Sequence, residues 1–287
     1  MVMAAGAVRC GFARASEVAA GDALAYARWV EEGKHGSMAF CERYADVRSN
    51  PALLLPGAGT VISCAFEYTQ TEHSPHIADY ALGLDYHYVL KRRLGPVADA
   101  ISQALDCECR IATDSAPMRE RYWAQQAGVG FIGRNGLLIV PGVGSYVLLA
   151  EIVCTVALEP DEPCLLSCIG CGACLKACPA RAIGEDGCVD ARRCISALTI
   201  EHRGALPPEA HLAGRLFGCD ACQRVCPHNR RASALRALPE FAPLPSTMQI
   251  SPDWLRGTTS SQFRKITAHT PLSRAPLAQF LRNASQL

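Results

Sequence analysis

The 287-residue sequence lacks an excess of charge of either sign, a long apolar run and an N-terminal segment of the secretory type. Its 28 Lys and Arg against 27 Asp and Glu give a net charge of +1, so overall charge favours no class of partner. The most apolar stretch, residues 136–158, is interrupted by Pro141, Gly142, Gly144 and Glu151, which argues against a membrane span. The first residues, MVMAAGAVRCGFARAS, do not have the pattern of a signal peptide. These absences predict a cytoplasmic protein that does not associate with membranes.

Cysteine, in contrast, is abundant, with 16 residues in the chain. Disulfide-rich sequences are mainly small secreted domains that cannot build a sufficient core. This chain has the length of about two domains, and its 49% hydrophobic and 19% charged residues are typical of a globular protein. In a reducing compartment we therefore expect the cysteines to bind metal.

The first half of the sequence alternates between helical and extended patterns. We expect helix in residues 1–45, 80–105 and 118–127. The second of these contains the pair Gly95-Pro96, which can kink a helix. Strands are predicted at 60–68, 110–113, 137–140 and 145–156, the last two joined by the turn PGVG. The fold class is therefore predicted to be α+β, with an α/β N-terminal domain.

Three segments differ in composition. Pro160 and Pro163 lie among acidic residues, a composition typical of a linker. We expect a first domain at 1–158, a cysteine-rich domain at 159–235 and a basic C-terminal extension at 236–287. Residues 229–287 hold eight Lys or Arg and two acids, a local charge of +6.

The cysteine-rich segment contains one complete motif and one partial copy of it. Cys168, Cys171, Cys174 and Cys178-Pro179 have the spacing C-x2-C-x2-C-x3-C-P of bacterial ferredoxins. Cys219, Cys222 and Cys226-Pro227 repeat its last three cysteines and proline. Because the fourth cysteine of such a run binds the other cluster, two 4Fe–4S clusters are predicted. One has the ligands Cys168, Cys171, Cys174 and Cys226, and the other has Cys178, Cys219, Cys222 and one upstream cysteine, Cys194 or Cys188.

Zinc is the alternative, but zinc sites usually combine two well-separated C-x2-C pairs, which this pattern does not resemble. Cys164 and Cys188 remain alternative ligands because they lie close to the motifs in the sequence. The other cysteines are expected to be small buried hydrophobic residues. They are Cys10, Cys41, Cys64, Cys107, Cys109 and Cys154.

The glycines Gly128, Gly130 and Gly133 match the G-x-G-x-x-G pattern of dinucleotide-binding folds. That motif requires a strand before it and a helix after it. Here the helical RYWAQQA precedes the glycines and the extended LLIV follows them, so we interpret the segment as a turn.

Taken together, several segments resemble the epoxyqueuosine reductase family. They are ALGLDYHYVLKRRL, TDSAPMRERYWAQQAGVGFIGRNGLLI, GSYVLLAEI, CIGCGACLKACPARAI, DARRCISALTIEHRG and FGCDACQRVCPHN. The resemblance covers about residues 45–235 and identifies a short form that lacks the C-terminal helical repeats of many members. It implies a cobalamin-dependent enzyme with two clusters that reduces epoxyqueuosine to queuosine at the wobble position of tRNA. The DARRC segment favours Cys194 over Cys188 as the eighth ligand.

The same resemblance implies the roles of residues in the first domain. Asp114 in TDSAP corresponds to the family's proton donor. Cobalamin is expected between the first domain and the cluster domain. The residues at or near it are Asp85, Tyr86, His87, Asp114, Arg134, Asn135, Ser145 and Tyr146.

Loss of the epoxide oxygen consumes two electrons and two protons, so an acid next to that oxygen would accelerate the reaction. An aspartate with an ordinary pKa of about 3.9 is ionised at neutral pH. We therefore hypothesise that burial raises the pKa of Asp114. Without the resemblance, the residue would be read as the start of a turn.

The expected partners are a tRNA substrate and a small electron donor, either a reductase, a ferredoxin or a flavodoxin, with the protein acting as a monomer. Cations of the basic extension are candidates for contact with RNA phosphates. They are Arg230, Arg231, Arg236, Arg256, Arg264 and Lys265. Two alternative functions are a corrinoid reductive dehalogenase and a ferredoxin-like electron carrier.

Overall fold

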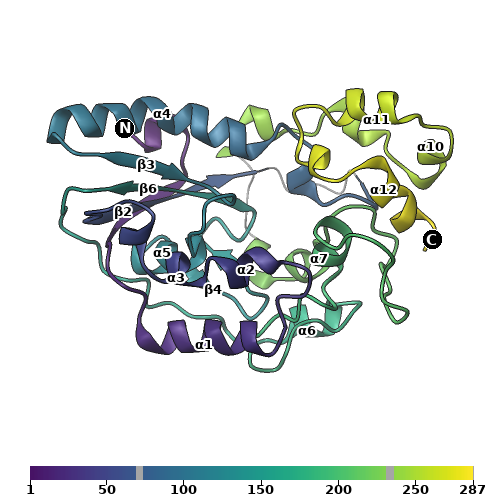
Figure 1. Cartoon of the computed structure of the whole chain (residues 1–287), viewed down its shortest axis with the longest axis horizontal. Coiled ribbons are helices and arrows are strands. Elements are labelled where there is room, and N and C mark those ends of the chain that lie inside the picture. The colour runs from purple at the N-terminus through teal and green to yellow at the C-terminus, as the bar shows by residue number, and fades with distance from the viewer. Residues whose placement is uncertain (69–73, 231–235, 287) are drawn as a thin grey trace.

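A four-stranded antiparallel sheet forms the centre of the first half of the protein (Figure 1). The computed structural model describes residues 1–68, 74–230 and 236–286. The strand order is β1-β2-β6-β3. The strands are β1 Arg9–Arg14, β2 Thr60–Glu67, β3 Cys109–Ala112 and β6 Val147–Cys154. Two short strands, β4 Phe131–Ile132 and β5 Leu138–Ile139, pair separately as a hairpin.

All residues of β2 are buried because helices cover both faces of the sheet. Ile62 and Phe66 pack on one face together with α4 (Tyr86–Leu105), and Val61 and Ala65 pack on the other with α5 (Glu120–Gln126). Figure 1 shows α4 above the sheet and α5 below it. The layered arrangement explains why the strand is mostly apolar on both faces and does not alternate between apolar and polar residues.

The remaining helices are short. They are α1 Ala20–Glu31, α2 Ala39–Arg43, α3 Ala45–Ser49, α6 Ala173–Ala177, α7 Ile195–Ile200, α8 Ala221–Arg224, α9 Pro245–Met248, α10 Pro252–Arg256, α11 Ser260–Thr267 and α12 Leu277–Ala284. The 3-10 turns include η3 Asp79–Ala81, η4 Pro227–Asn229 and η7 Pro271–Arg274.

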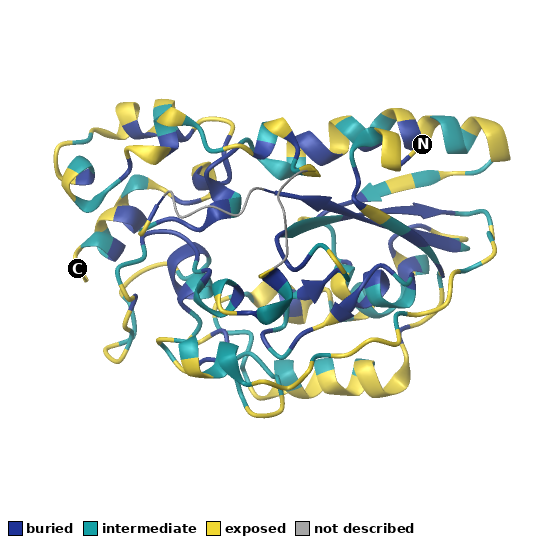
Figure 2. Ribbon diagram, turned by 180° about the vertical axis from the view of Figure 1, so that it is seen from behind, coloured by how far each residue is buried: buried dark blue, intermediate teal, exposed yellow. Residues whose placement is uncertain are grey.

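The C-terminal segment is folded onto the rest of the protein. Phe263 and Phe280, from α11 and α12, are buried in one hydrophobic cluster with Leu82, Ile200 and Phe217. Figure 2 shows the buried inner faces of these helices and their exposed outer faces. Helix α12 is further attached by Arg282, which donates hydrogen bonds to the carbonyls of residues 198, 202 and 204. Residues after the cysteine motifs therefore contribute to the core.

The predicted α+β class is confirmed, as are the strands near 60–68 and 110–113 and the helix near 118–127. The prediction of helix throughout residues 1–45 is wrong at β1, which pairs with β2. Gly11 of this strand lies against the carbonyl of Ala127, where a side chain has no room. The strand has only six residues, too few for an alternation of apolar and polar residues to identify it in the sequence. The strands at 137–140 and 145–156 exist, but they belong to different sheets.

The predicted helix at 80–105 starts later, at Tyr86. Asp85 precedes its first turn, and its carboxylate accepts the backbone N–H of His87 as an N-cap. Pro96 lies within the continuous helix α4. Over the residues that the structure describes, no helix combines the length and apolar character needed to cross a bilayer.

Candidate active site and cluster-binding cysteines

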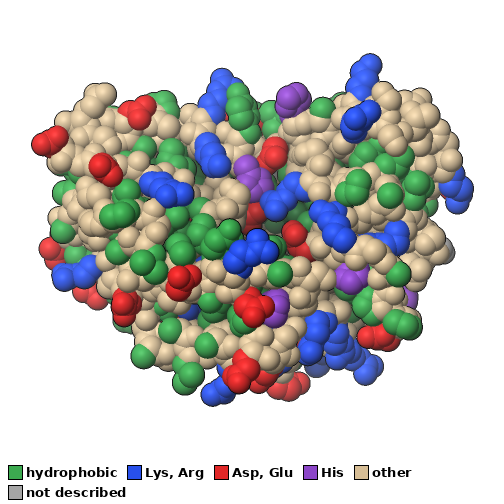
Figure 3. Space-filling view, in the orientation of Figure 1, with side chains coloured by type: hydrophobic (Ala, Val, Ile, Leu, Met, Phe, Trp, Pro, Cys, Tyr) green, Lys and Arg blue, Asp and Glu red, His purple; other side chains and the backbone are tan. Residues whose placement is uncertain are grey.

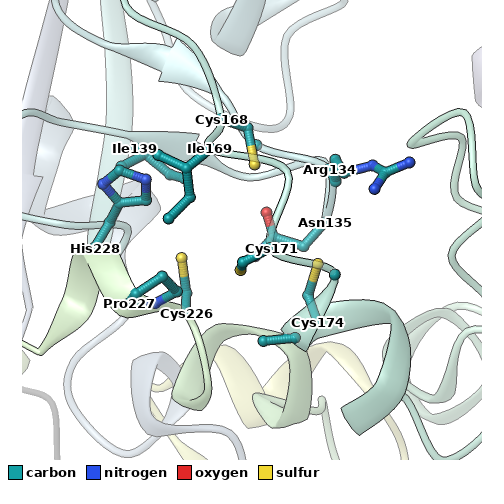
Figure 4. A pocket seen from close by; sticks show the side chains of 13 residues that line it. Arg134, Asn135, Ile139, Cys168, Ile169, Cys171, Cys174, Cys226, Pro227 and His228 are labelled. Carbon is teal, nitrogen blue, oxygen red and sulfur yellow. The ribbon is translucent and has the colours of Figure 1, made fainter.

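Four of the predicted cluster ligands line one pocket (Figure 4). Cys168, Cys171 and Cys174 come from the loop before α6 and from α6 itself, whereas Cys226 follows α8. The first motif contributes its first three thiols to this set, and the last cysteine of the second motif, Cys226, supplies the fourth. This is the exchange of ligands that the sequence predicts for two ferredoxin-type clusters.

The chemistry of the pocket suits an iron–sulfur cluster. Asn135 and His228 line it, and Asn135 Nδ2 and His228 Nε2 are buried without a hydrogen-bond partner within the described part of the chain. Buried polar groups of this kind normally have a partner. Inorganic sulfide and thiolate sulfur accept hydrogen bonds, and such bonds tune a cluster.

The other four predicted ligands also lie near one another, where α6 contacts α8. Burial raises the pKa of the Cys222 thiol, and the neighbouring thiols of Cys219, Cys194 and Cys178 raise it further. Cys194 immediately precedes α7. The structure thus brings together Cys178, Cys194, Cys219 and Cys222 as a second set of four.

The two alternative ligands are placed differently. Burial raises the pKa of Cys188, whose electrostatic neighbours are Lys34 and the acids Asp186, Glu32 and Asp190 rather than other thiols. Cys164 packs against Phe131 and Ile139, in the hydrophobic cluster that also includes Cys168 and Cys226. The geometry therefore favours Cys194 over Cys188 in the second set.

A buried hydrogen-bond network joins the cluster segment to the first half of the protein. The Asn229 carboxamide accepts the N–H of Ser145 at 2.7 Å and donates to the Gln223 carbonyl at 2.8 Å. Gln223 donates in turn to the Ser145 carbonyl and to Tyr68. Because Cys222 and Cys226 lie in the same segment, these bonds fix the backbone that carries them. Ser145 was expected near a corrin, but its polar atoms are used in this interior network.

Among the other expected corrin residues, Tyr146 is buried and packs edge-on against Tyr68. Asn135 faces the first thiol set, as described above. Arg134 is partly exposed and lies next to Glu185, donating to its carbonyl. These residues therefore occupy several different environments.

Asp85, Tyr86, His87 and Asp114 do come together, at the N-terminus of α4. His87 Nδ1 lies 2.7 Å from Asp85 Oδ1, and its Nε2 lies 3.0 Å from Asp114 Oδ2. The ring of Tyr86 stacks on that of His87 with centroids 4.1 Å apart, and its hydroxyl also contacts Asp114. An imidazole with a carboxylate at each nitrogen makes both hydrogen bonds as a donor only when it is protonated.

Asp114 lies in the loop between β3 and α5, with a backbone φ of 45°. This left-handed conformation is uncommon outside glycine, although aspartate adopts it more readily than most residues. The N–H of Asp114 donates to the carboxylate of Glu120 in the first turn of α5. The side chain of Asp114 is 43% exposed, and it is turned toward α4 and the C-terminal segment.

Arg274, at the end of η7, completes this group and was not predicted as a site residue. Its Nη1 lies 2.7 Å from Asp114 Oδ2 and 3.1 Å from His87 Nε2. In the sequence Arg274 is only one of the cations of the basic segment, 160 residues from Asp114. No local pattern indicates its position, because the contact depends on how the C-terminal helices pack.

The hypothesis of a raised pKa for Asp114 is wrong in this arrangement. Burial alone would raise it, but the hydrogen bonds and charges of His87 and Arg274 outweigh burial and hold the pKa well below its ordinary value. For His87, burial acts to lower the pKa, but Asp114 and Asp85 together raise it from 6.5 to about 9. At neutral pH the proton is therefore on His87 and the negative charge is on Asp114. Burial and the nearby charge of Asp114 also raise the pKa of Glu120, to about 8.

One face of the molecule is hollowed near its centre, where arginine, acidic and histidine side chains lie beside hydrophobic ones (Figure 3). Such a mixed surface can hold a large ligand that has both apolar and polar parts.

Comparison with known proteins agrees with this arrangement. Residues 167–229 match the family model described as "4Fe-4S double cluster binding domain". Residues 48–115 match the model described as "Epoxyqueuosine reductase QueG, DUF1730". Asp85 and Asp114 lie within the second match.

Curated relatives match most of the chain. The epoxyqueuosine reductase of Xanthomonas campestris is 34% identical over 294 residues, covering 97% of this chain and 82% of the relative. That of Synechococcus is 39% identical over 247 residues, covering 83% and 76%. The crystal structure of an epoxyqueuosine reductase with an epoxyqueuosine-modified tRNA stem loop superposes with a TM-score of 0.89 and 29% identity, covering 99% of this chain and 78% of that one. This protein therefore belongs to the epoxyqueuosine reductase family.

Proposed function

We propose that this protein reduces epoxyqueuosine in tRNA to queuosine, using cobalamin and electrons that pass through two 4Fe–4S clusters. One observation carries the proposal. This member of the family has two sets of four thiols together with the polar group around Asp114. The clusters would transfer single electrons, and the first half of the chain would bind the reacting groups.

The proposed ligand sets follow the spatial grouping of the thiols. Cys168, Cys171, Cys174 and Cys226 would hold one cluster, and Cys178, Cys194, Cys219 and Cys222 the other. We propose the domain division at residues 158 and 235 for the same reason, since the eight ligands fall between these positions. The C-terminal part would then complete the active site through Arg274.

A corrin fits the hollow face because the macrocycle is largely apolar and carries polar amide groups at its edge. Tyr86 and Arg134, both partly exposed, would contact it from α4 and from the turn after β4. Ser145 and Tyr146 would support it indirectly, as buried neighbours. When bound, cobalamin would supply a low-valent cobalt that delivers electrons to the substrate carbon.

The chain's own residues would supply protons. Removal of an epoxide oxygen as water consumes two protons and two electrons. The carboxylate of Asp114 is exposed enough to reach substrate, and His87 holds a proton 3.0 Å away. Asp114 would therefore relay the proton from His87 to the departing oxygen.

Contact with tRNA would use exposed cations of the C-terminal part. Arg264 and Lys265 are exposed in the last turn of α11, and Arg230 and Arg236 are exposed near the second motif, whereas Arg231 lies outside the described residues. Arg256 is paired with Asp253. Replacing both Arg264 and Lys265 by Gln should weaken tRNA binding and flatten its salt dependence. Unchanged affinity and salt slope would exclude this surface.

The electron donor would be a small one-electron carrier, and we propose that the enzyme works as a monomer in the cytoplasm. The names of the curated relatives favour the reduction of epoxyqueuosine over the dehalogenase and carrier functions, and the solved structure with a tRNA stem loop favours tRNA as the molecule that carries it.

The decisive experiment supplies anaerobic, cobalamin-loaded protein with a chemical reductant and tRNA that contains epoxyqueuosine. Nucleosides of the digested tRNA are then quantified by liquid chromatography and mass spectrometry. Queuosine should appear as epoxyqueuosine disappears, and Cys222→Ser should abolish the conversion. An organohalide should not be dehalogenated. Corrinoid binding without conversion of the nucleoside would contradict the proposal.

A further inference from the structure

Arg274 contacts both members of the pair that handles the proton. Its Nη1 is 2.7 Å from Asp114 Oδ2 and 3.1 Å from His87 Nε2. A guanidinium nitrogen can only donate hydrogen bonds. A contact between Arg274 and His87 Nε2 is therefore a hydrogen bond only when that nitrogen carries no proton.

Two hydrogen-bond patterns follow from these three atoms. With His87 protonated, its Nε2–H and the N–H of Arg274 both donate to Asp114 Oδ2. With His87 neutral at Nε2, the nitrogen becomes an acceptor, and Arg274 can donate to it without moving far. Arg274 thus has a partner both before and after His87 loses its proton.

We propose that Arg274 is a positioning residue for proton transfer. It keeps Asp114 ionised, so that this carboxylate can relay protons, and it donates a hydrogen bond to His87 Nε2 once that nitrogen has lost its proton. The inference rests on the proposed function for the identity of the proton acceptor. Both C–O bonds of the epoxide break with their electron pairs on oxygen, which leaves as water after taking up two protons, and the two electrons that form the C=C bond come from the reduced cofactors. Each proton passes from His87 Nε2 to Asp114 Oδ2 and on to that oxygen, and solvent reprotonates His87 after each transfer.

The surroundings of His87 support this division of roles. Asp85 faces Nδ1, Asp114 and Arg274 face Nε2, and Tyr86 stacks on the ring. Glu120 also acts electrostatically on Asp114, and Glu201 on Arg274. Two acids directly at the ring hold the proton on His87, and Arg274 is the cation that faces the same nitrogen as Asp114.

Arg274 has a second effect, because a cation 3.1 Å from Nε2 disfavours a second positive charge there. Without it, His87 would hold its proton more tightly and release it more slowly. The side chain of Arg274 is 38% exposed, so replacing it should not leave a buried void.

The first test measures the protonation of His87 without turnover. Diethyl pyrocarbonate reacts with histidine only when its imidazole is neutral, and peptide mass spectrometry can compare His87 with the exposed His211 at each pH. Labelling of His87 should begin near its pKa of about 9. Arg274→Met should move the half-point to higher pH, and Arg274→Lys, which keeps the charge, should leave it nearly unchanged. Identical half-points in wild type and Arg274→Met would overturn the inference.

The second test uses single-turnover reduction of epoxyqueuosine. Arg274→Met should lower the maximal single-turnover rate about tenfold or more without changing the tRNA concentration that gives half of that rate, and Arg274→Lys should retain most of the rate. His87→Leu should be slower by roughly 10²-fold at neutral pH. In the His87→Leu background, adding Arg274→Met should raise the rate at low pH, since Asp114 has then lost both cations and can carry a proton itself.

A purely structural Arg274 predicts the opposite for this double variant, which would then be slower than His87→Leu at every pH. That result would overturn the inference. Iron content, measured for every variant, distinguishes misfolding from altered chemistry. If wild type never converts epoxyqueuosine while the labelling shift is observed, the proposed function fails but the coupling of Arg274 to His87 stands.

Discussion

The substitution Asp114→Asn removes the negative charge of Asp114 and keeps the shape of its side chain. The pKa of His87 is raised from 6.5 to about 9, because the imidazolium donates hydrogen bonds to Asp114 and to Asp85, and these outweigh the effect of burial. At 1.36 kcal/mol per unit this corresponds to about 3 kcal/mol favouring the imidazolium form. An opposite charge at this distance typically accounts for one to three units, so the variant should lower the pKa of His87 by at least about one unit.

The carboxamide cannot relay a proton as a carboxylate does. Single-turnover conversion of epoxyqueuosine, followed by mass spectrometry of the nucleosides, should therefore slow by about 10²–10⁴-fold in Asp114→Asn. Iron and sulfide should match wild type, because none of the proposed cluster ligands is changed. Wild-type turnover in this variant, or an unmoved His87 labelling curve, would refute the reasoning.

Three further predictions concern stability and cluster assembly. Cys222→Ser should lose about half of the iron, whereas the control Cys188→Ser should keep all of it; equal iron loss would contradict the ligand assignment. Asn229→Ala should lower the free energy of unfolding by about 1–3 kcal/mol in anaerobic urea titrations, because it leaves buried partners unpaired. Since the pKa of His87 is raised on folding, its stabilisation is complete below pH 6.5 and is lost as pH rises through about 9. The difference in unfolding free energy between wild type and His87→Leu should shrink by about 2 kcal/mol across that window, allowing for solvent screening at Asp114, and a constant difference would contradict it.

The cysteine motifs could be interpreted from the sequence because their spacing determines which thiols can surround a cluster. Cysteines three residues apart can bind neighbouring irons of one cluster, and the last cysteine of each motif binds the other cluster. The pocket that contains Cys226 together with the first three cysteines of the other motif illustrates this exchange. Spacing alone left the eighth ligand open between Cys194 and Cys188, because it lies outside both motifs, and only the family resemblance favoured Cys194. Only the fold shows that Cys194 lies near Cys222 and that Cys188 lies among charged residues.

The polar site was only partly predictable. Asp85, His87 and Asp114 were found by resemblance, and the structure joins them by hydrogen bonds. The protonation state of Asp114 was predicted in the wrong direction, because sequence reasoning considered burial and could not include a guanidinium from residue 274. Contacts between residues so far apart in sequence arise from packing of the C-terminal helices on the hydrophobic cluster around Phe217 and Phe280.

The central claim is that eight thiols in two spatial sets hold two iron–sulfur clusters. The most direct test is to quantify iron and acid-labile sulfide in protein purified without oxygen. The account predicts about eight of each per chain, and about four of each in Cys222→Ser. Stoichiometric zinc without sulfide in the wild-type protein would contradict it.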